Sequence, residues 1–142
     1  MKPRCVLAVD DEPSDLENLR RVLTAAGYDV RTASNAKTAI EIFQAHADDI
    51  DVLVTDVAMS PISGPDLAGQ LVRLKPDLYV TFVSAYSGSL AFRYSGVPIS
   101  TFAFVAKPFS ANDLLEKISP QTEQAGREKV LSSGGAAASS EA

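Results

Sequence analysis

The chain has 142 residues, 46% of them apolar and 22% charged, and carries a formal net charge of −5. This length suits one domain with a single core, and the acidic balance, without a cluster of lysine and arginine, argues against direct binding to nucleic acid or to an anionic membrane. No signal peptide is visible and no apolar stretch is long enough to span a bilayer, so we expect a cytoplasmic protein.

The first elements in chain order are an apolar strand, a helix and a second strand. Cys5–Val9 is a continuous apolar run, typical of a strand buried on both faces, and it ends at a pair of acids. Ser14-Asp-Leu-Glu17 is a capping-box pattern that predicts the start of a helix, and Gly27 predicts its end. Tyr28–Ala33 alternates in polarity, which predicts a strand at the edge of a sheet.

A second helix and the central strand follow. Ser34 or Asn35 can cap the helix. The residues that we expect on its buried face are Ala36, Ile40, Phe43 and Ala47. Asp51–Asp56 is a short apolar run with a carboxylate at its downstream end, which predicts a buried strand that presents Asp56 at the edge of the sheet.

The second half of the chain repeats the alternation. We expect a helix over Asp66–Leu74, a strand over Tyr79–Ser84, a short and weak helix over Leu90–Tyr94, and a strand over Thr101–Ala106. Ser110-Ala-Asn-Asp113 then caps a last helix that runs to about residue 118.

Five strands that alternate with five helical segments predict an α/β fold, a doubly wound five-stranded parallel sheet with flanking helices. One alternating strand at an edge and continuous apolar strands inside fit the order 2-1-3-4-5, which is the known flavodoxin-like order. We expect residues 1–118 to form this domain. Residues 119–142 are rich in Ser, Gly and Ala and bury too little apolar surface to offset their ordering entropy, so we expect a disordered tail.

Polar side chains follow four of the five predicted strands. They are Asp10 and Asp11, Asp56, Ser84, and Lys107. Because the carboxyl ends of parallel strands meet at one edge, we expect these side chains to share a pocket. Three carboxylates repel one another unless a cation neutralises them, and oxygen ligands in that number suit Mg²⁺. Asp56 would then be a nucleophile toward a phosphoryl group, with Mg²⁺ and Lys107 offsetting the charge on the transferred oxygens.

Four sequence stretches at these strand ends resemble the receiver domain of two-component response regulators. They are Val9-Asp10-Asp11-Glu12-Pro13, Thr55-Asp56-Val57-Ala58-Met59, Val83-Ser84-Ala85 and Phe104-Val105-Ala106-Lys107-Pro108-Phe109. The resemblance covers about residues 3–118, and the combination of motifs is highly specific.

The resemblance implies a role for each site residue. Asp56 accepts a phosphoryl group from a phosphohistidine on a sensor histidine kinase or on a histidine phosphotransfer protein. Asp11, Asp56 and the main-chain carbonyl of Ala58 bind Mg²⁺, with Asp10 assisting, and Lys107 pairs with the phosphoryl oxygens. The domain is then a signalling switch rather than an enzyme.

The resemblance also implies how the switch works. Ser84 bonds a phosphoryl oxygen and Phe104 turns inward behind it, so that a downstream protein target senses the change. The Lys107–Pro108 bond is expected to be cis. Tyr86, two residues after Ser84, is expected to modulate the access of water to the phosphorylated aspartate. Receivers often dimerise, so a homodimer is one possible form of this protein, and the sequence does not decide it.

Some positions depart from the common family pattern. Ser60 stands where the family usually has Pro, and Ser63 where Asp is frequent, so we expect the loop after Asp56 to take a different path. Ser84 replaces the commoner Thr and keeps the hydroxyl group. Phe104 replaces the commoner Tyr, so a signal relayed by a tyrosine hydroxyl is absent here.

Other functional classes fit the residues less well. A phosphatase with an aspartate nucleophile places an acid/base Asp two residues later, where this chain has Ala58. A nucleotide-binding domain needs a glycine-rich turn after the first strand, where this chain has Asp10-Asp11-Glu12-Pro13. A degenerate receiver that only binds partners would not need the intact set of acids, hydroxyl and lysine.

The context of the domain leaves two alternatives. Met1 lies close to the first strand, which favours a stand-alone, single-domain response regulator. The segments Tyr94–Pro98 and Phe104–Phe109 are similar to receivers attached to hybrid histidine kinases, so a receiver from a hybrid kinase is the alternative.

Overall fold

The computed structural model of the protein describes residues 4–85 and 102–118. The elements, in chain order, are β1 (Cys5–Val9), α1 (Pro13–Ala25), β2 (Asp29–Ala33), α2 (Ala36–His46), β3 (Ile50–Asp56), α3 (Gly64–Leu74), β4 (Tyr79–Ser84) and β5 (Phe102–Ala106). Residues 111–118 form a further helix. The predicted strands are confirmed to within a residue where they are described.

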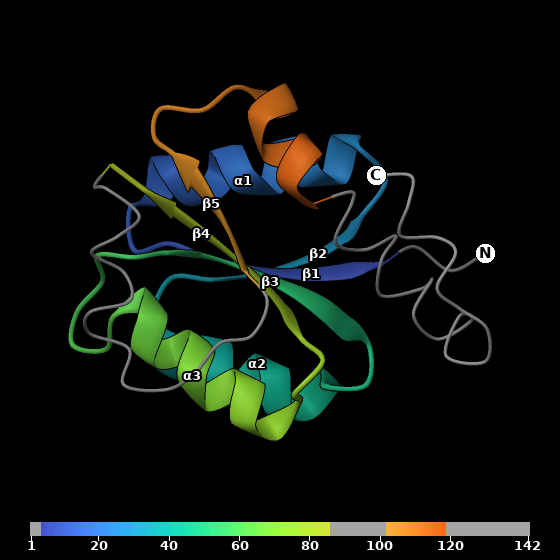
Figure 1. Cartoon of the computed structure of the whole chain (residues 1–142), viewed down its shortest axis with the longest axis vertical. Coiled ribbons are helices and arrows are strands. Elements are labelled where there is room, and N and C mark those ends of the chain that lie inside the picture. Colours follow the sequence, from blue (N-terminus) through green and yellow to red (C-terminus); the bar gives the residue numbers. More distant parts are fainter. Residues whose placement is uncertain (1–3, 86–101, 119–142) are drawn as a thin grey trace.

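The five strands form one sheet in the order β2-β1-β3-β4-β5, and every neighbouring pair is parallel. Figure 1 shows α1 and the helix over 111–118 on one face of this sheet, and α2 and α3 on the other face. The predicted doubly wound, flavodoxin-like α/β fold and its strand order are confirmed. This order places β1 and β3, the strands that lead to the acids, side by side in the middle of the sheet.

Two hydrophobic clusters hold the layers together, one on each face of the sheet. The cluster under α2 and α3 includes Phe43, Leu67 and Leu71, and the cluster under α1 and the helix over 111–118 includes Leu19 and Leu114. Every residue of β1 is buried, since helices cover both of its faces, whereas β2 is only partly buried at its edge position. The apolar and alternating patterns therefore correspond to strand position.

The buried face of α2 differs slightly from the expected one. Ala36 and Phe43 are buried as predicted, but Ile40 is only partly buried and Ala39 is fully buried in its place. Ala47, also predicted on this face, is only partly buried and follows the end of the helix. The buried face thus follows spacings of three and four residues from Ala36, one of the two patterns that a helix allows.

The capping box predicted at Ser14–Glu17 is wrong. Helix α1 begins at Pro13, its N-cap residue is Glu12, and no side chain caps it. Proline suits the first helical position, because its fixed φ matches the helix and its missing N–H would have had no partner there. Ser14 consequently lies inside the first turn and cannot serve as the cap.

The other predicted caps are present. The Ser110 hydroxyl accepts from the backbone N–H of Asp113, and the Asp113 carboxylate accepts from the backbone N–H of Ser110, both at 3.1 Å. Helix α3 begins two residues before the predicted start, because the Ser63 hydroxyl caps it by accepting from the N–H of Asp66 at 3.2 Å.

The cap of α2 gives a stability prediction. Asn35 accepts a hydrogen bond from the backbone N–H of Thr38 at 2.8 Å. We expect Asn35→Ala to lower the free energy of unfolding by about 1 kcal/mol, because the N–H of Thr38 loses its partner. Ser14→Ala is the matched control, with an expected change within about 0.5 kcal/mol. Urea unfolding measures both, and equal losses for the two variants would contradict the assignment.

Some expectations fall outside the described residues. They are the short helix over Leu90–Tyr94, the role of Tyr86, the segment Tyr94–Pro98 and the disordered tail over residues 119–142. Within the described ranges, no helix combines the length and the apolar character that crossing a membrane requires.

Candidate functional site

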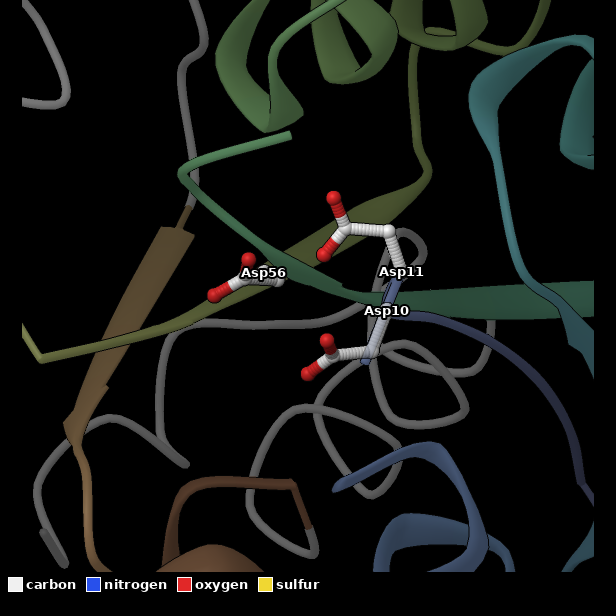
Figure 2. A group of neighbouring side chains, drawn as sticks. All are labelled: Asp10, Asp11 and Asp56. Atoms are coloured by element: carbon white, nitrogen blue, oxygen red, sulfur yellow. The ribbon is translucent and has the colours of Figure 1, made fainter. Parts of the chain in front are cut away.

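The candidate site lies at the carboxyl edge of the sheet, where the predicted acids come together. Asp10 and Asp11 follow β1, and Asp56 is the last residue of β3. Figure 2 shows the three side chains gathered at these two strand ends. One carboxylate oxygen from each of the three residues lies within 4.8 Å of the others. Because β1 and β3 are adjacent and parallel, Asp10 and Asp56 are neighbours although they are 46 positions apart in the sequence.

The Lys107 ammonium group lies among these acids. Its Nζ atom is 2.9 Å from Asp10 Oδ2, 2.9 Å from Asp15 Oδ2 and 3.2 Å from Asp56 Oδ1. The lysine follows β5 directly, and its main-chain N–H donates to the carbonyl of Ser84 at 2.9 Å. The Lys107–Pro108 peptide bond is cis, as the resemblance implied.

Burial shapes the electrostatics of the site. Asp10 is fully buried, and the Asp56 side chain is only 10% exposed. Burial raises the pKa of Asp56 above its ordinary value, repulsion from Asp10 acts in the same direction, and Lys107 only partly opposes them. Burial alone would lower the pKa of Lys107, but its hydrogen bonds to Asp10 and Asp15 outweigh this and raise the pKa. Lys107 therefore stays a cation.

The two acids that follow β1 have different surroundings. Asp10 uses one carboxylate oxygen to accept from the N–H of Glu12 at 3.0 Å and the other to accept from Lys107. Asp11 is exposed at the surface. The internal bonds of Asp10 fit an assisting role toward a cation better than a direct one, and they leave Asp11 and Asp56 as the more accessible oxygen donors.

The donor set at this edge fits a magnesium ion. Three carboxylates offer hard oxygen ligands, and the single positive charge of Lys107 offsets only part of the repulsion between them, so a further cation would be favoured. Within the described part of the chain, this is the group of acids whose oxygen atoms lie close enough together to hold a metal ion. Ala58, whose main-chain carbonyl is expected to bind the ion together with Asp11 and Asp56, lies two residues after Asp56 in an exposed part of the following loop.

The loop after Asp56 is held close to the sheet by backbone contacts. The N–H of Val57 donates to the carbonyl of Val83 at 3.2 Å, and the N–H of Gly64 donates to the carbonyl of Val57 at 2.9 Å. A Cβ atom on Gly64 would lie 2.0 Å from the carbonyl oxygen of Asp56, so only glycine fits there. The Ser60–Pro61 bond in this loop is cis, which is a feature that the sequence did not predict.

The two expected switch residues lie on β4 and β5, which follow β3 in the sheet. Ser84 is buried at the end of β4, adjacent to the strand that carries Asp56. Phe104 in β5 pairs in register with Phe82 of β4 and packs partly buried against the core under α2 and α3. Ser84 is thus on the strand next to Asp56, whereas Phe104 is one strand further away.

Sequence reasoning missed Asp15 and Gly64. Asp15 lies in the first turn of α1, five residues after Asp10, and its contact with Lys107 joins residues 92 positions apart. The available signal for Asp15 was an acid in the first turn of a helix that follows the acidic strand end. The signal for Gly64 was a glycine in the loop that follows the predicted nucleophile.

Comparison with known proteins gives a consistent result. The family model described as "Response regulator receiver domain" matches residues 6–119. Sensor kinase CckA of Brucella abortus is 33% identical over 119 residues, which cover 84% of this chain and 12% of the relative. Response regulator MprA of Mycobacterium leprae is 34% identical over 113 residues, which cover 80% of this chain and 48% of the relative.

A solved structure supports the same family. The crystal structure of a response regulator receiver domain protein from Clostridium thermocellum superimposes with a TM-score of 0.77 at 29% identity, over 90% of this chain and 98% of that one. The chain spans less than half the length of the two curated relatives named above. Since the family model matches well over half of the chain, the protein belongs to the response regulator receiver domain family of two-component systems.

Proposed function

We propose that the domain is a phosphorylatable switch, in which Asp56 receives a phosphoryl group from a phosphohistidine of a sensor histidine kinase or a histidine phosphotransfer protein. The observation that carries this proposal is the position of Lys107, whose ammonium group lies 3.2 Å from the Asp56 carboxylate beside two further acids. A nucleophile, a fixed cation and a candidate metal site thus meet at one edge of the sheet.

In the transfer step, the protein positions the Asp56 carboxylate and supplies positive charge beside the transferred phosphoryl group. A carboxylate oxygen of Asp56 attacks phosphorus, the new O–P bond forms as the P–N bond breaks, and the departing histidine keeps the electron pair. Lys107 offsets the negative charge on the transferred oxygens. Mg²⁺, when bound, supplies the remaining positive charge, and the residues that would hold it are Asp10, Asp11, Asp56 and the main-chain carbonyl of Ala58.

Phosphorylation then changes the balance of forces around the site. The phosphoryl group adds about −1.5 to −2 charges at the end of β3. Ser84, on the adjacent strand, donates its hydroxyl to a phosphoryl oxygen, and Phe104 moves inward behind it. A downstream protein target senses the altered surface, so the domain acts as a signalling component rather than as an enzyme with turnover on a separate substrate.

The proposal assigns residues 1–118 to the receiver and residues 119–142 to a tail, and it places the domain in the cytoplasm with its kinase. A stand-alone regulator is the form that we propose, and a receiver within a hybrid kinase is the alternative, which is supported by the match to a short part of the sensor kinase CckA. The same chemistry at Asp56 applies to both.

Intact mass spectrometry tests the proposal. The protein is incubated with a small acyl-phosphate donor in the presence of Mg²⁺ and, in parallel, after removal of Mg²⁺ by a chelator. We expect a gain of one phosphoryl group with Mg²⁺ and little or none without it, because unneutralised carboxylates repel the incoming group. No gain under either condition, or a gain that does not depend on Mg²⁺, would contradict the proposal.

A further inference from the structure

We infer that Asp15 is a positioning residue, which holds the Lys107 ammonium group toward α1 in the unphosphorylated domain and competes for it with the phosphoryl group on Asp56. The inference rests on the proposed function. It assigns to Asp15 a control over how readily the phosphorylated state forms.

The contact between Asp15 and Lys107 is one of the two shortest that the lysine makes. Lys107 Nζ donates to Asp15 Oδ2 at 2.9 Å, the same distance as to Asp10 and 0.3 Å less than the 3.2 Å to Asp56. An ammonium group has three donor hydrogens, and three carboxylates surround this one. A phosphoryl oxygen that pairs with Lys107 therefore competes with these carboxylates for the donor hydrogens of the ammonium group.

Burial decides which carboxylate is displaced. Asp10 is fully buried, and the N–H of Glu12 is neutral, so separating Asp10 from Lys107 would leave a negative charge in the interior without its paired cation. Asp56 carries the phosphoryl group itself and stays beside the lysine. The Asp15 side chain is 43% exposed, so water can solvate it when the contact opens. Of the three contacts of Lys107, the one with Asp15 therefore costs the least free energy to break.

The negative charge of Asp15 also disfavours the phosphorylated state. Asp15 is not among the three acids whose oxygens lie within 4.8 Å of one another, so a bound cation would be shared by Asp10, Asp11 and Asp56 instead. Asp15 thus adds a negative charge beside Lys107 without joining that group. Because phosphorylation brings further negative charge to the site, this carboxylate opposes it.

A purely structural role for Asp15 makes a different prediction. A carboxylate in the first turn of a helix stabilises the helix through the backbone dipole. Neutralising it would then lower the thermal stability of the domain without strengthening the binding of a phosphoryl group. The two roles are separated by measuring anion affinity and stability on the same variants.

The experiment compares Asp15→Asn with Asp15→Glu, which keeps the charge, and with Glu17→Gln. Glu17 lies on the same helix and pairs with Arg20 on an exposed surface, so its variant loses the same charge without touching Lys107. The probe is beryllium fluoride, a phosphoryl mimic, titrated at saturating Mg²⁺. The affinity for Mg²⁺ alone, the thermal stability of each variant and the extent of phosphorylation by a small acyl phosphate are measured alongside.

We expect Asp15→Asn to bind beryllium fluoride about three- to tenfold more tightly than the wild type, because the competing carboxylate is gone. Its affinity for Mg²⁺ should not rise, since the variant has one negative charge fewer. Asp15→Glu and Glu17→Gln should stay within about twofold of the wild type for beryllium fluoride.

Three outcomes would overturn the inference. One is an Asp15→Asn affinity for beryllium fluoride that is unchanged or weaker, and another is an equal gain in Glu17→Gln, which would indicate a general charge effect. In both cases a wild type that is phosphorylated normally keeps the proposed function intact. A wild type that takes up neither beryllium fluoride nor a phosphoryl group overturns the proposed function and this inference together.

Discussion

Asp56→Asn is expected to abolish the Mg²⁺-dependent gain of a phosphoryl group and, at the same time, to make the metal-free domain more stable. The amide has no charged oxygen to attack phosphorus, so the mass gain should disappear. The stability should rise because burial and repulsion from Asp10 raise the pKa of Asp56, which means that the folded domain disfavours its ionised carboxylate. Intact mass spectrometry and urea unfolding measure the two effects.

The pH dependence of the stability difference follows from the sign of the pKa shift. A carboxyl group whose pKa is raised in the folded state contributes to the free energy of unfolding while it is protonated. This contribution is complete below the ordinary pKa, and it is lost as the pH rises through the folded-state pKa. The stability advantage of Asp56→Asn should therefore be largest near neutral pH and should shrink in acid. An advantage that grows toward acid pH would contradict the assigned direction.

Asp51→Asn is the matched control for this variant. Asp51 lies on the same strand near its opposite end, where it pairs with Arg4 at 3.4 Å and with Lys75 at 3.8 Å. This variant should lose two partly buried ion pairs yet keep the full mass gain. A phosphoryl gain that persists in Asp56→Asn, or that disappears in Asp51→Asn, would show that the acceptor is a different residue.

Gly64→Ala is expected to destabilise the domain by about 3 kcal/mol, because its Cβ atom would lie 2.0 Å from the carbonyl oxygen of Asp56. The atom in conflict belongs to the main chain, so no side-chain rotation relieves the overlap, and the start of α3 must move away from the strand. Urea unfolding measures the loss. Phosphorylation by the acyl phosphate should also slow, since the displaced segment borders the acceptor.

Gly27→Ala separates this steric effect from the conformational freedom of glycine. Gly27 has a φ of 97° after the end of α1, but a Cβ atom there would have no neighbour within 4 Å. Its replacement should therefore cost only the backbone strain of a left-handed conformation, about 1 kcal/mol. A loss in Gly64→Ala no larger than that in Gly27→Ala would contradict the proposed overlap.

The fold could be predicted from the sequence because local pattern and position in the sheet agree. The continuous apolar run of β1 corresponds to a central strand and the alternating run of β2 to an edge. The acids and the lysine could be placed together for the same reason, since parallel strands bring their carboxyl ends to one edge. The failed cap at Ser14 shows the limit of a short motif, because Pro13 competes for the helix start and decides it.

Asp15 and Gly64 could not be found in this way because their roles depend on contacts between distant segments. Asp15 reaches Lys107 only because α1 begins at Pro13, shortly after the end of β1, which places its first turn beside the strand ends. The requirement for glycine at position 64 comes from the main chain of Asp56. No periodicity or motif in the sequence encodes either distance.

The hydrogen bonds at the end of β4 have a consequence for how such a domain can evolve. The carbonyl of Val83 holds the residue after Asp56, and the carbonyl of Ser84 holds Lys107. Both contacts are made by main-chain atoms, so a substitution at either residue of β4 leaves the partners of those contacts unchanged. A related sequence that forms the same sheet therefore keeps the main-chain positions of Val57 and Lys107, whichever side chain stands at position 84.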